Sequence, residues 1–206
     1  MNANTDNQSH SADLPLGEGR RGLNLEGFGV NVCVFCSSSN NIAEAYKQSA
    51  FRLGELIAGS GNTLVYGGAD GGLMSAVAGG ASSKGGDIIG VIAEPIVRMN
   101  RQSKFPTQFI TVKDLSERKR KMKEIADLFV VLPGGYGTLD EMFDVLASGL
   151  VGEHDIPLYL INEDGFFDCL LNEIDVMKAE KCIAENISYN FYVLDSAESF
   201  SVLSDL

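Results

Sequence analysis

The sequence has 206 residues, of which 45% are hydrophobic, so it is long enough to bury a substantial core and short enough for a single domain. Its formal net charge of −12 repels polyphosphate backbones and anionic membrane surfaces, which argues against nucleic-acid or membrane partners. No apolar run reaches membrane-spanning length, and the first residues lack the pattern of a secretion signal. We therefore expect a cytoplasmic protein.

Residues 1–26 are polar and turn-rich, which predicts a flexible N-terminal tail followed by one domain over residues 27–206. Apolar runs and helical periodicity then alternate along the chain. The predicted order is strand 30–36, helix 42–58, strand 63–66, a helix from 73, strand 87–93, loop 94–105, strand 108–112, helix 114–126, strand 128–132, a helix to about 150, strand 157–161, helix 166–178, strand 191–194 and a helical turn 196–206.

This alternation of strands and helices is typical of an α/β fold. It predicts an open, mostly parallel, doubly wound sheet of about six or seven strands with helices on both faces. Such sheets bind ligands in the crevice at the carboxyl ends of the strands. The turns that follow the strands are therefore the first places to look for a site.

Two of these turns are rich in glycine, Gly67–Gly72 and Gly134–Gly137. Glycine lets the backbone approach an anion closely and adopt positive φ, and the following helix start offers unpaired N–H groups. Both turns are therefore candidate phosphate-binding loops. Tight packing of a strand against a helix, without any ligand, is the alternative explanation for the first turn.

The helix over residues 114–126 has two local signals. Asp114 and Glu117 have the spacing of a capping box, and the periodicity predicts that Leu115, Met122 and Ile125 face the core. The basic residues that follow the cap are expected on its solvated face; they are Arg120, Lys121 and Lys123.

Cysteine and histidine are too few to indicate a metal site or a disulfide framework. Cys33 and Cys36 lie three apart in a strand, so their side chains are expected on opposite faces as buried thiols. The two histidines are His10 in the tail and His154 in a predicted loop. Histidine catalysis and zinc chemistry are therefore poorly supported.

The second glycine turn carries a motif. Residues 133–141 read Pro-Gly-Gly-Tyr-Gly-Thr-Leu-Asp-Glu, which matches Pro-Gly-Gly-x-Gly-Thr-x-x-Glu, the hallmark of the LONELY GUY phosphoribohydrolases, long mislabelled as lysine decarboxylases. Residues 117–119, Glu-Arg-Lys, followed by Met122, resemble the Arg-Lys helix of that family. Residues 33–39 and 67–74 resemble its first two ligand turns, and the likeness covers about residues 30–200.

The resemblance implies a Rossmann-like, usually dimeric protein that needs no metal or organic cofactor. Its reaction would be hydrolysis of the N-glycosidic bond of a nucleoside 5′-monophosphate, such as AMP or a cytokinin riboside monophosphate, to free base and ribose 5-phosphate. By motif position Arg118 and Glu141 match the catalytic pair. The substrate-binding residues expected from the motif and the turns are Lys119, Gly134, Gly135, Tyr136, Gly137, Thr138, Ser37, Gly67 and Gly68.

These residue types suit that chemistry. A fixed carboxylate stabilises an oxocarbenium-like transition state or activates water, a role for Glu141. Arginine stays charged and presents a planar fork, so Arg118 suits phosphate or hydroxyl oxygens or the departing base. Thr138 and Glu141 also form a T-x-x-E capping box, in which Glu141 would only start a helix, and Asp140 is by default a solvated acid of the first helical turn.

Two departures from the family pattern concern the base. Leu115-Ser116 stand where members commonly have Met-His, and residues 147–150 read Ala-Ser-Gly-Leu where members often carry Thr-Trp-x-Gln. The base pocket is therefore expected to differ. The rival function is a non-catalytic binder, such as the molybdenum-cofactor carriers that resemble this fold. Lysine decarboxylation would ordinarily use pyridoxal phosphate on a Schiff-base lysine, and no sequence context singles one out.

Overall fold

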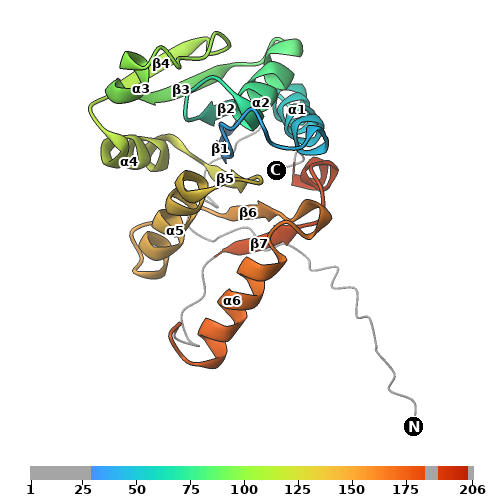
Figure 1. The fold of residues 1–206 in the computed structure, drawn as a ribbon, viewed down its shortest axis with the longest axis vertical. Coiled ribbons are helices and arrows are strands. Elements are labelled where there is room, and N and C mark those ends of the chain that lie inside the picture. Colours follow the sequence, from blue (N-terminus) through green and yellow to red (C-terminus); the bar gives the residue numbers. More distant parts are fainter. Residues whose placement is uncertain (1–28, 184–189, 204–206) are drawn as a thin grey trace.

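The structure is a computed structural model that describes residues 29–183 and 190–203 (Figure 1). The tail expected over residues 1–26 lies outside the described residues. The elements are β1 (Asn31–Phe35), α1 (Glu44–Gly59), β2 (Thr63–Tyr66), α2 (Gly72–Ser83), β3 (Ile88–Ala93), α3 (Glu94–Arg98), β4 (Gln108–Val112), α4 (Leu115–Ile125), β5 (Leu128–Val131), α5 (Tyr136–Leu150), β6 (Leu158–Ile161), the 3-10 helix η2 (Glu163–Gly165), α6 (Asp168–Ala179), β7 (Phe191–Leu194) and the 3-10 helix η3 (Glu198–Leu203).

The seven strands form one sheet in the order β4-β3-β2-β1-β5-β6-β7, and every neighbouring pair is parallel. The predicted α/β class and parallel sheet are confirmed. The number of strands, seven, is the larger of the two predicted values. The chain winds outward from β1 to β4 and then returns to place β5 on the other side of β1. The order of the strands therefore reverses between β1 and β5.

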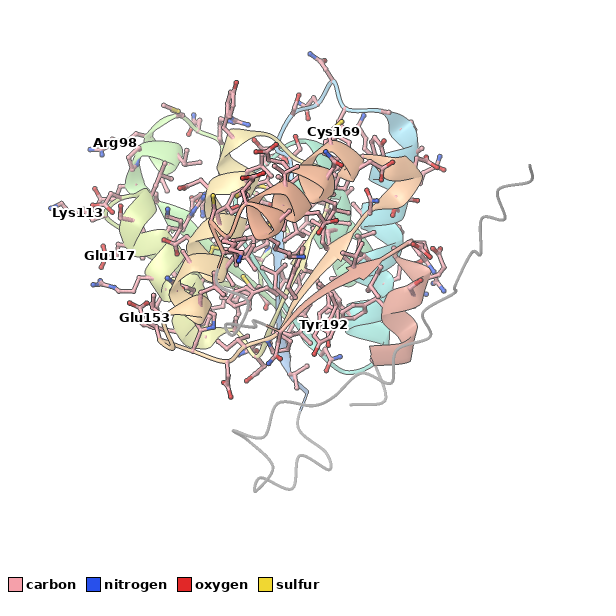
Figure 2. All side chains as sticks on the ribbon, turned by 90° about the horizontal axis from the view of Figure 1, so that it is seen from below. Arg98, Lys113, Glu117, Glu153, Cys169 and Tyr192 are labelled. Carbon is pink, nitrogen blue, oxygen red and sulfur yellow. The ribbon has the colours of Figure 1, made fainter. Side chains whose placement is uncertain are left out.

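Successive side chains of the central strands enter two separate cores, because strand side chains alternate between the faces of a sheet. Cys36 lies in the core covered by α1 and α2, whereas Cys33 lies in the core covered by α4, α5 and α6. Both thiols are free and buried, as expected. Figure 2 shows the sheet between these two helix layers, with α1 and α2 in blue to teal and α4 and α5 in yellow-green to yellow.

Helix α4 confirms the predicted cap but not all of its predicted core face. The Asp114 side chain accepts from the Glu117 N–H at 2.9 Å, and the Glu117 carboxylate accepts from the Lys113 N–H at 2.9 Å. Met122 is fully buried, but Leu115 is 50% exposed, so its predicted inward orientation is wrong. Arg118 takes the buried position one turn before Met122, because residues four apart share a helix face.

The predicted loop 94–105 is wrong over its first five residues, where α3 follows β3 directly. Pro95 occupies the first turn of α3, where its missing N–H removes no helical hydrogen bond. The segment after α3 then runs along the Gly67–Gly72 turn: the Asp70 N–H donates to the Arg101 carbonyl at 2.7 Å and the Ser103 N–H to the Gly68 carbonyl at 2.9 Å.

The remaining element boundaries lie within about two residues of the predicted ones, apart from the last turn, whose predicted end falls beyond residue 203. Among the helices in the described ranges, none is long and apolar enough to cross a membrane.

Candidate active site

The reversal of strand order places the ends of β1 and β5 side by side, and parallel sheets bind ligands at such a point. The Ser37 N–H donates to the Pro133 carbonyl at 3.1 Å, which joins the two turns. The Ser37 carbonyl accepts from the N–H groups of Leu73 and Met74 at 2.9 and 3.2 Å, which fixes the start of α2. The turns that follow β1, β2 and β5 thus meet at the carboxyl ends of these strands.

In the motif turn, glycine leaves room rather than allowing unusual backbone angles. None of Gly134, Gly135 and Gly137 has positive φ, so that expectation is wrong. A Cβ atom on Gly135 or Gly137 would meet no atom within 4 Å, whereas one on Gly134 would overlap the Thr138 side chain. Gly135 is the N-cap of α5 and supplies no capping side chain. The first N–H groups of α5 therefore have no side-chain cap, which an anion site requires.

Arg118 and Glu141 form a buried ion pair between α4 and α5. The Nη2 group of Arg118 donates to Oε1 of Glu141, and their side chains are only 11% and 3% exposed. The helix starts two residues before Thr138, with Gly135 as its N-cap, so the capping-box interpretation of Thr138 and Glu141 is wrong. The structure thus brings together the two residues that the motif assigned to catalysis.

Burial raises the pKa of Glu141 to about 7, because a charged carboxylate is poorly solvated inside the protein. The positive charge of Arg118 opposes this rise, and the charges of Asp140 and Lys119 act in opposite directions to a smaller extent. A carboxyl group that titrates near neutral pH can exist in both protonation states under working conditions, which is typical of acid–base groups in active sites.

The guanidinium of Arg118 also lies next to the first glycine turn. A Cβ atom on Gly67 would come within 3.4 Å of its Nη1 atom. Its Nε atom is buried and has no hydrogen-bond partner among the described residues. A buried unpaired donor is costly, so the Nε group of Arg118 is a polar atom of the pair that lacks an acceptor among the described residues.

The other predicted substrate-binding residues lie around this pair in different settings. Gly68 has φ +67° and faces Gly90 and Ile92 of β3 instead of α5. Tyr136, the first residue of α5, is 96% exposed. The Oγ atom of Ser37 accepts from the Ser39 N–H at 3.1 Å within its own turn.

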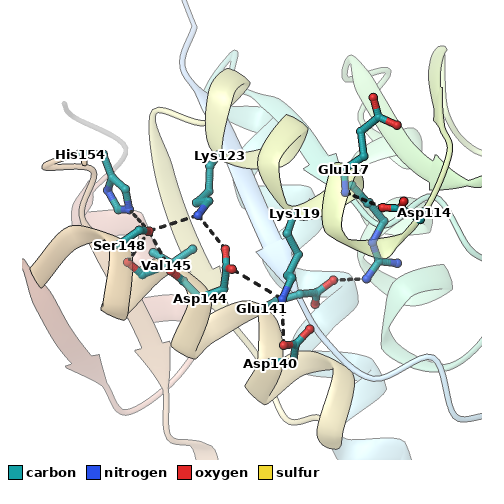
Figure 3. A network of polar contacts seen from close by, with 11 residues as sticks. Asp114, Glu117, Lys119, Lys123, Asp140, Glu141, Asp144, Val145, Ser148 and His154 are labelled. Atoms are coloured by element: carbon teal, nitrogen blue, oxygen red, sulfur yellow. Dashed lines mark hydrogen bonds and ion pairs between the residues drawn. The ribbon is translucent and has the colours of Figure 1, made fainter. Parts of the chain in front are cut away.

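Lys119 lies on the outer side of the pair. Its Nζ atom is 2.8 Å from Oδ1 of Asp140 and 3.6 Å from Oδ1 of Asp144 (Figure 3). Burial lowers the pKa of Lys119, but the hydrogen bond to Asp140 and the charge of Asp144 outweigh this effect and raise the pKa overall. Asp140 is exposed, as expected, but it is paired as well as solvated.

Sequence reasoning missed several residues near the site. Lys123 was expected on a solvated face, yet its side chain is 20% exposed and its Nζ atom lies 2.7 Å from Asp144, so that expectation is wrong. Arg120, at 68% exposure, is solvated as expected. Arg101 Nη2 donates to Ser38 Oγ at 3.3 Å across the crevice edge. For the contact between Lys123 and Asp144, the only signal in the sequence was the i, i+4 spacing of Lys119 with Lys123 and of Asp140 with Asp144.

Within the described residues, no group of three or more His, Cys, Asp or Glu side chains is placed to hold a metal ion.

The chain is similar to known proteins over most of its length. Residues 74–202 match the family described as "Possible lysine decarboxylase", which is more than half of the chain. The cytokinin riboside 5′-monophosphate phosphoribohydrolase LOG5 of Arabidopsis thaliana is 39% identical over 70% of this chain and 63% of its own length. The rice enzyme of the same description, LOG, is 37% identical over 75% of this chain and 64% of its own length. The chain thus spans less than two thirds of both relatives.

Among solved structures, the molybdenum cofactor binding protein of Rippkaea orientalis superposes with a TM-score of 0.65 over 86% of this chain and 96% of its own. Its sequence identity is 22%, so the likeness concerns the fold alone.

Proposed function

We propose that this protein hydrolyses the N-glycosidic bond of a nucleoside 5′-monophosphate. The chain belongs to the LONELY GUY family, whose matching model is described as "Possible lysine decarboxylase" and whose named relatives are phosphoribohydrolases. The products are the free base and ribose 5-phosphate, and AMP or a cytokinin riboside monophosphate is the substrate. Two relatives that share more than a third of their aligned residues with this chain carry the corresponding phosphoribohydrolase name.

The observation that carries the proposal is the buried Arg118–Glu141 pair, which lies beside an uncapped helix start at the point where the strand order reverses. The start of α5 binds the 5′-phosphate, with Gly135 and Gly137 leaving space for it. In this proposed binding mode the ribose lies over the carboxylate of Glu141, one helical turn beyond the phosphate.

In the reaction, the bond between C1′ and the base nitrogen breaks and its electron pair leaves with the base. The carboxylate of Glu141 stabilises the positive charge that develops on the ribose ring, and it accepts a proton from the water that attacks C1′. The base takes up a proton from the solvent and Glu141 returns its proton to the solvent, so that overall one water molecule is divided between the two products. Arg118 stays charged and keeps Glu141 oriented through the hydrogen bond of its Nη2 group.

The test is to incubate the purified protein with AMP, other nucleoside monophosphates and isopentenyladenosine monophosphate, and to measure free base by chromatography. Release of base from at least one of them is expected. The absence of free base from all of them, with nucleotide binding intact, would overturn the hydrolase proposal in favour of a non-catalytic binder.

Glu141→Gln is the matched variant. It is expected to lower turnover at least a hundredfold while nucleotide binding persists. Glutamine keeps an oxygen for Arg118 and resembles the protonated acid that burial favours, so at pH 5 the melting temperature is expected to change by less than about 4 °C. Turnover like that of the wild type would leave Glu141 with a structural role only. Glu124→Gln, an exposed change on α4, is the control.

The homodimer implied by the resemblance stays a prediction, which light scattering of the purified protein would test.

A further inference from the structure

The facing sides of α4 and α5 carry a ladder of charged and polar residues next to Glu141 (Figure 3). We define this ladder as Lys119 and Lys123 of α4 with Asp140, Asp144 and Ser148 of α5. Within each helix its members are four residues apart, so each row lies on one helix face. The rungs are Lys119 to Asp140, Lys119 and Lys123 to Asp144, and Lys123 to Ser148.

Asp144 is the shared member of the ladder. Its Oδ1 atom lies 3.6 Å from the Nζ of Lys119, and its Oδ2 atom lies 2.7 Å from the Nζ of Lys123. The lysine side chains are 17% and 20% exposed and that of Asp144 is 30% exposed, so these charges are screened less than charges in bulk water. One carboxylate therefore lies between two ammonium groups and attracts both by its charge.

The far end of the ladder is fixed as well. The Ser148 hydroxyl donates to the Asp144 carbonyl at 2.7 Å and accepts from Lys123 at 3.2 Å. The Ile156 N–H donates to Nδ1 of His154 at 3.3 Å, so the proton of the neutral ring is on Nε2, which faces Ser148 Oγ at 3.0 Å. Burial, together with the charge of Lys123, lowers the pKa of His154 and favours this neutral form.

The two partners of Lys119 differ in distance and exposure. Asp140 makes the closer contact, a hydrogen bond of 2.8 Å, but its side chain is 59% exposed, so water and incoming anions can reach it. Asp144 is half as exposed and is held in turn by Lys123. An anion that arrives at the start of α5 can therefore replace Asp140 as a partner of Lys119, while Asp144 retains the lysine. A lysine ammonium has three donors, enough for Asp144 and a phosphate oxygen together.

We propose that Asp144 is a positioning residue for the candidate site: by sharing its carboxylate between Lys119 and Lys123, it holds the Lys119 ammonium at the edge of the Arg118–Glu141 pair, where it exchanges Asp140 for a phosphate oxygen of the substrate. The proposal rests on the proposed function for the identity of the substrate. It assigns Asp144 to binding and orientation and leaves the reacting atoms to Arg118 and Glu141.

The experiment uses Asp144→Asn in the full chain. Its binding of AMP is measured by calorimetry, and its release of base is measured in steady state. We expect AMP to bind about tenfold more weakly and KM to rise by the same factor, a loss of roughly 1.4 kcal/mol of binding free energy. Because Arg118 and Glu141 keep their contact, kcat is expected to stay within about twofold. Asp144→Glu keeps the charge and should restore most of the affinity.

Glu124→Gln is the matched control, because it also removes one negative charge from the region, at an exposed pair on α4. Its affinity and KM should equal those of the wild type. If Asp144 only neutralises positive charge, Asp144→Asn will bind AMP as well as or better than the wild type, and the positioning proposal is overturned. A parallel loss of kcat and of thermal stability, without rescue by Asp144→Glu, overturns it as well.

The binding measurement separates this proposal from the proposed function. Weaker AMP binding by Asp144→Asn, in a protein that releases no base, leaves the positioning role in place and removes the hydrolase. If the wild type releases base but the wild type and Asp144→Asn bind AMP equally well, the hydrolase proposal stands and the positioning role of Asp144 is overturned. A wild-type protein that binds no AMP overturns both.

Discussion

The two glycine turns that end β2 and β5 look alike in sequence but use glycine for different reasons. In the first turn, Gly71 and Gly72 have φ of +119° and +51°, and a Cβ atom on them would lie 2.6 and 2.5 Å from the carbonyl oxygens of Ser38 and Ser39. In the second turn, Gly135 and Gly137 have ordinary angles and face open space. The backbone requires glycine at Gly71 and Gly72 of the first turn, whereas a side chain at Gly135 or Gly137 of the second turn would meet no neighbouring atom.

The largest expected effect that sharpens this comparison is on stability, from Gly72→Ala. The left-handed conformation and the overlap with Ser37 and Ser39 backbone atoms together should lower the free energy of unfolding by about 3 kcal/mol. Urea unfolding followed by circular dichroism measures this loss. Gly61→Ala is the control, since Gly61 has φ +75° with no neighbour within 4 Å, and it should lose only about 1 kcal/mol. Equal losses would show that packing around Gly72 is unimportant.

The next largest expected effect is the pH dependence of stability that Glu141, in the helix after the second turn, causes. Burial raises the pKa of Glu141 from the ordinary value of 4.5 to about 7, so the folded protein binds its proton more tightly than the unfolded chain. This contribution to stability is fully present below pH 4.5 and is lost as the pH rises through about 7. The stability of the wild type relative to Glu141→Gln should therefore fall between pH 5 and pH 8, by on the order of 2 kcal/mol in urea unfolding.

A constant difference between the two proteins over this range would mean that Arg118 keeps Glu141 ionised throughout. In turnover, the same titration should appear as a rise of kcat/KM with pH toward 7, because the carboxylate form is the one that assists catalysis.

The smallest expected change in stability is that of Gly137→Ala, and its sign is opposite to that of Gly72→Ala. Gly137 lies in the first turn of α5 with ordinary backbone angles, so Gly137→Ala should leave stability unchanged or raise it by up to about 1 kcal/mol. The added methyl group should nonetheless weaken AMP binding, because it occupies the space beside the helix start. Calorimetry and urea unfolding of the same variant check both signs. Unchanged AMP affinity would break the comparison, since the second turn would then have no ligand to accommodate.

Much of the fold could be predicted because strands and helices leave local periodic patterns. The bounds of β2, β4 and β7 coincide with the predicted segments, and the cap of α4 was visible in the spacing of Asp114 and Glu117. The pattern failed at α3, where Pro95 suggested a loop. Proline suits both a loop and the first turn of a helix, so the sequence could not decide between them.

The candidate site was predicted in its residues but not in its geometry. The motif and the resemblance named Arg118 and Glu141, and the structure brings them into contact. The burial of Arg118 in place of Leu115, the pairing of Lys123 with Asp144 and the position of Arg101 beside Ser38 were not predicted. Each of these depends on a partner at least 21 residues away along the chain, which a local pattern does not contain.

The sequence by itself thus determined the succession of strands and helices and the motif at the end of β5, because these depend on local backbone preferences and on residue types. Only the tertiary structure decided that the two glycine turns have different roles. The packing of the first turn against Ser38 and Ser39 and the open space beside the second are set by neighbours that folding brings together. The same docking of α4 on α5 buries Glu141 against Arg118 and turns a residue of a helical motif into a candidate catalytic carboxylate.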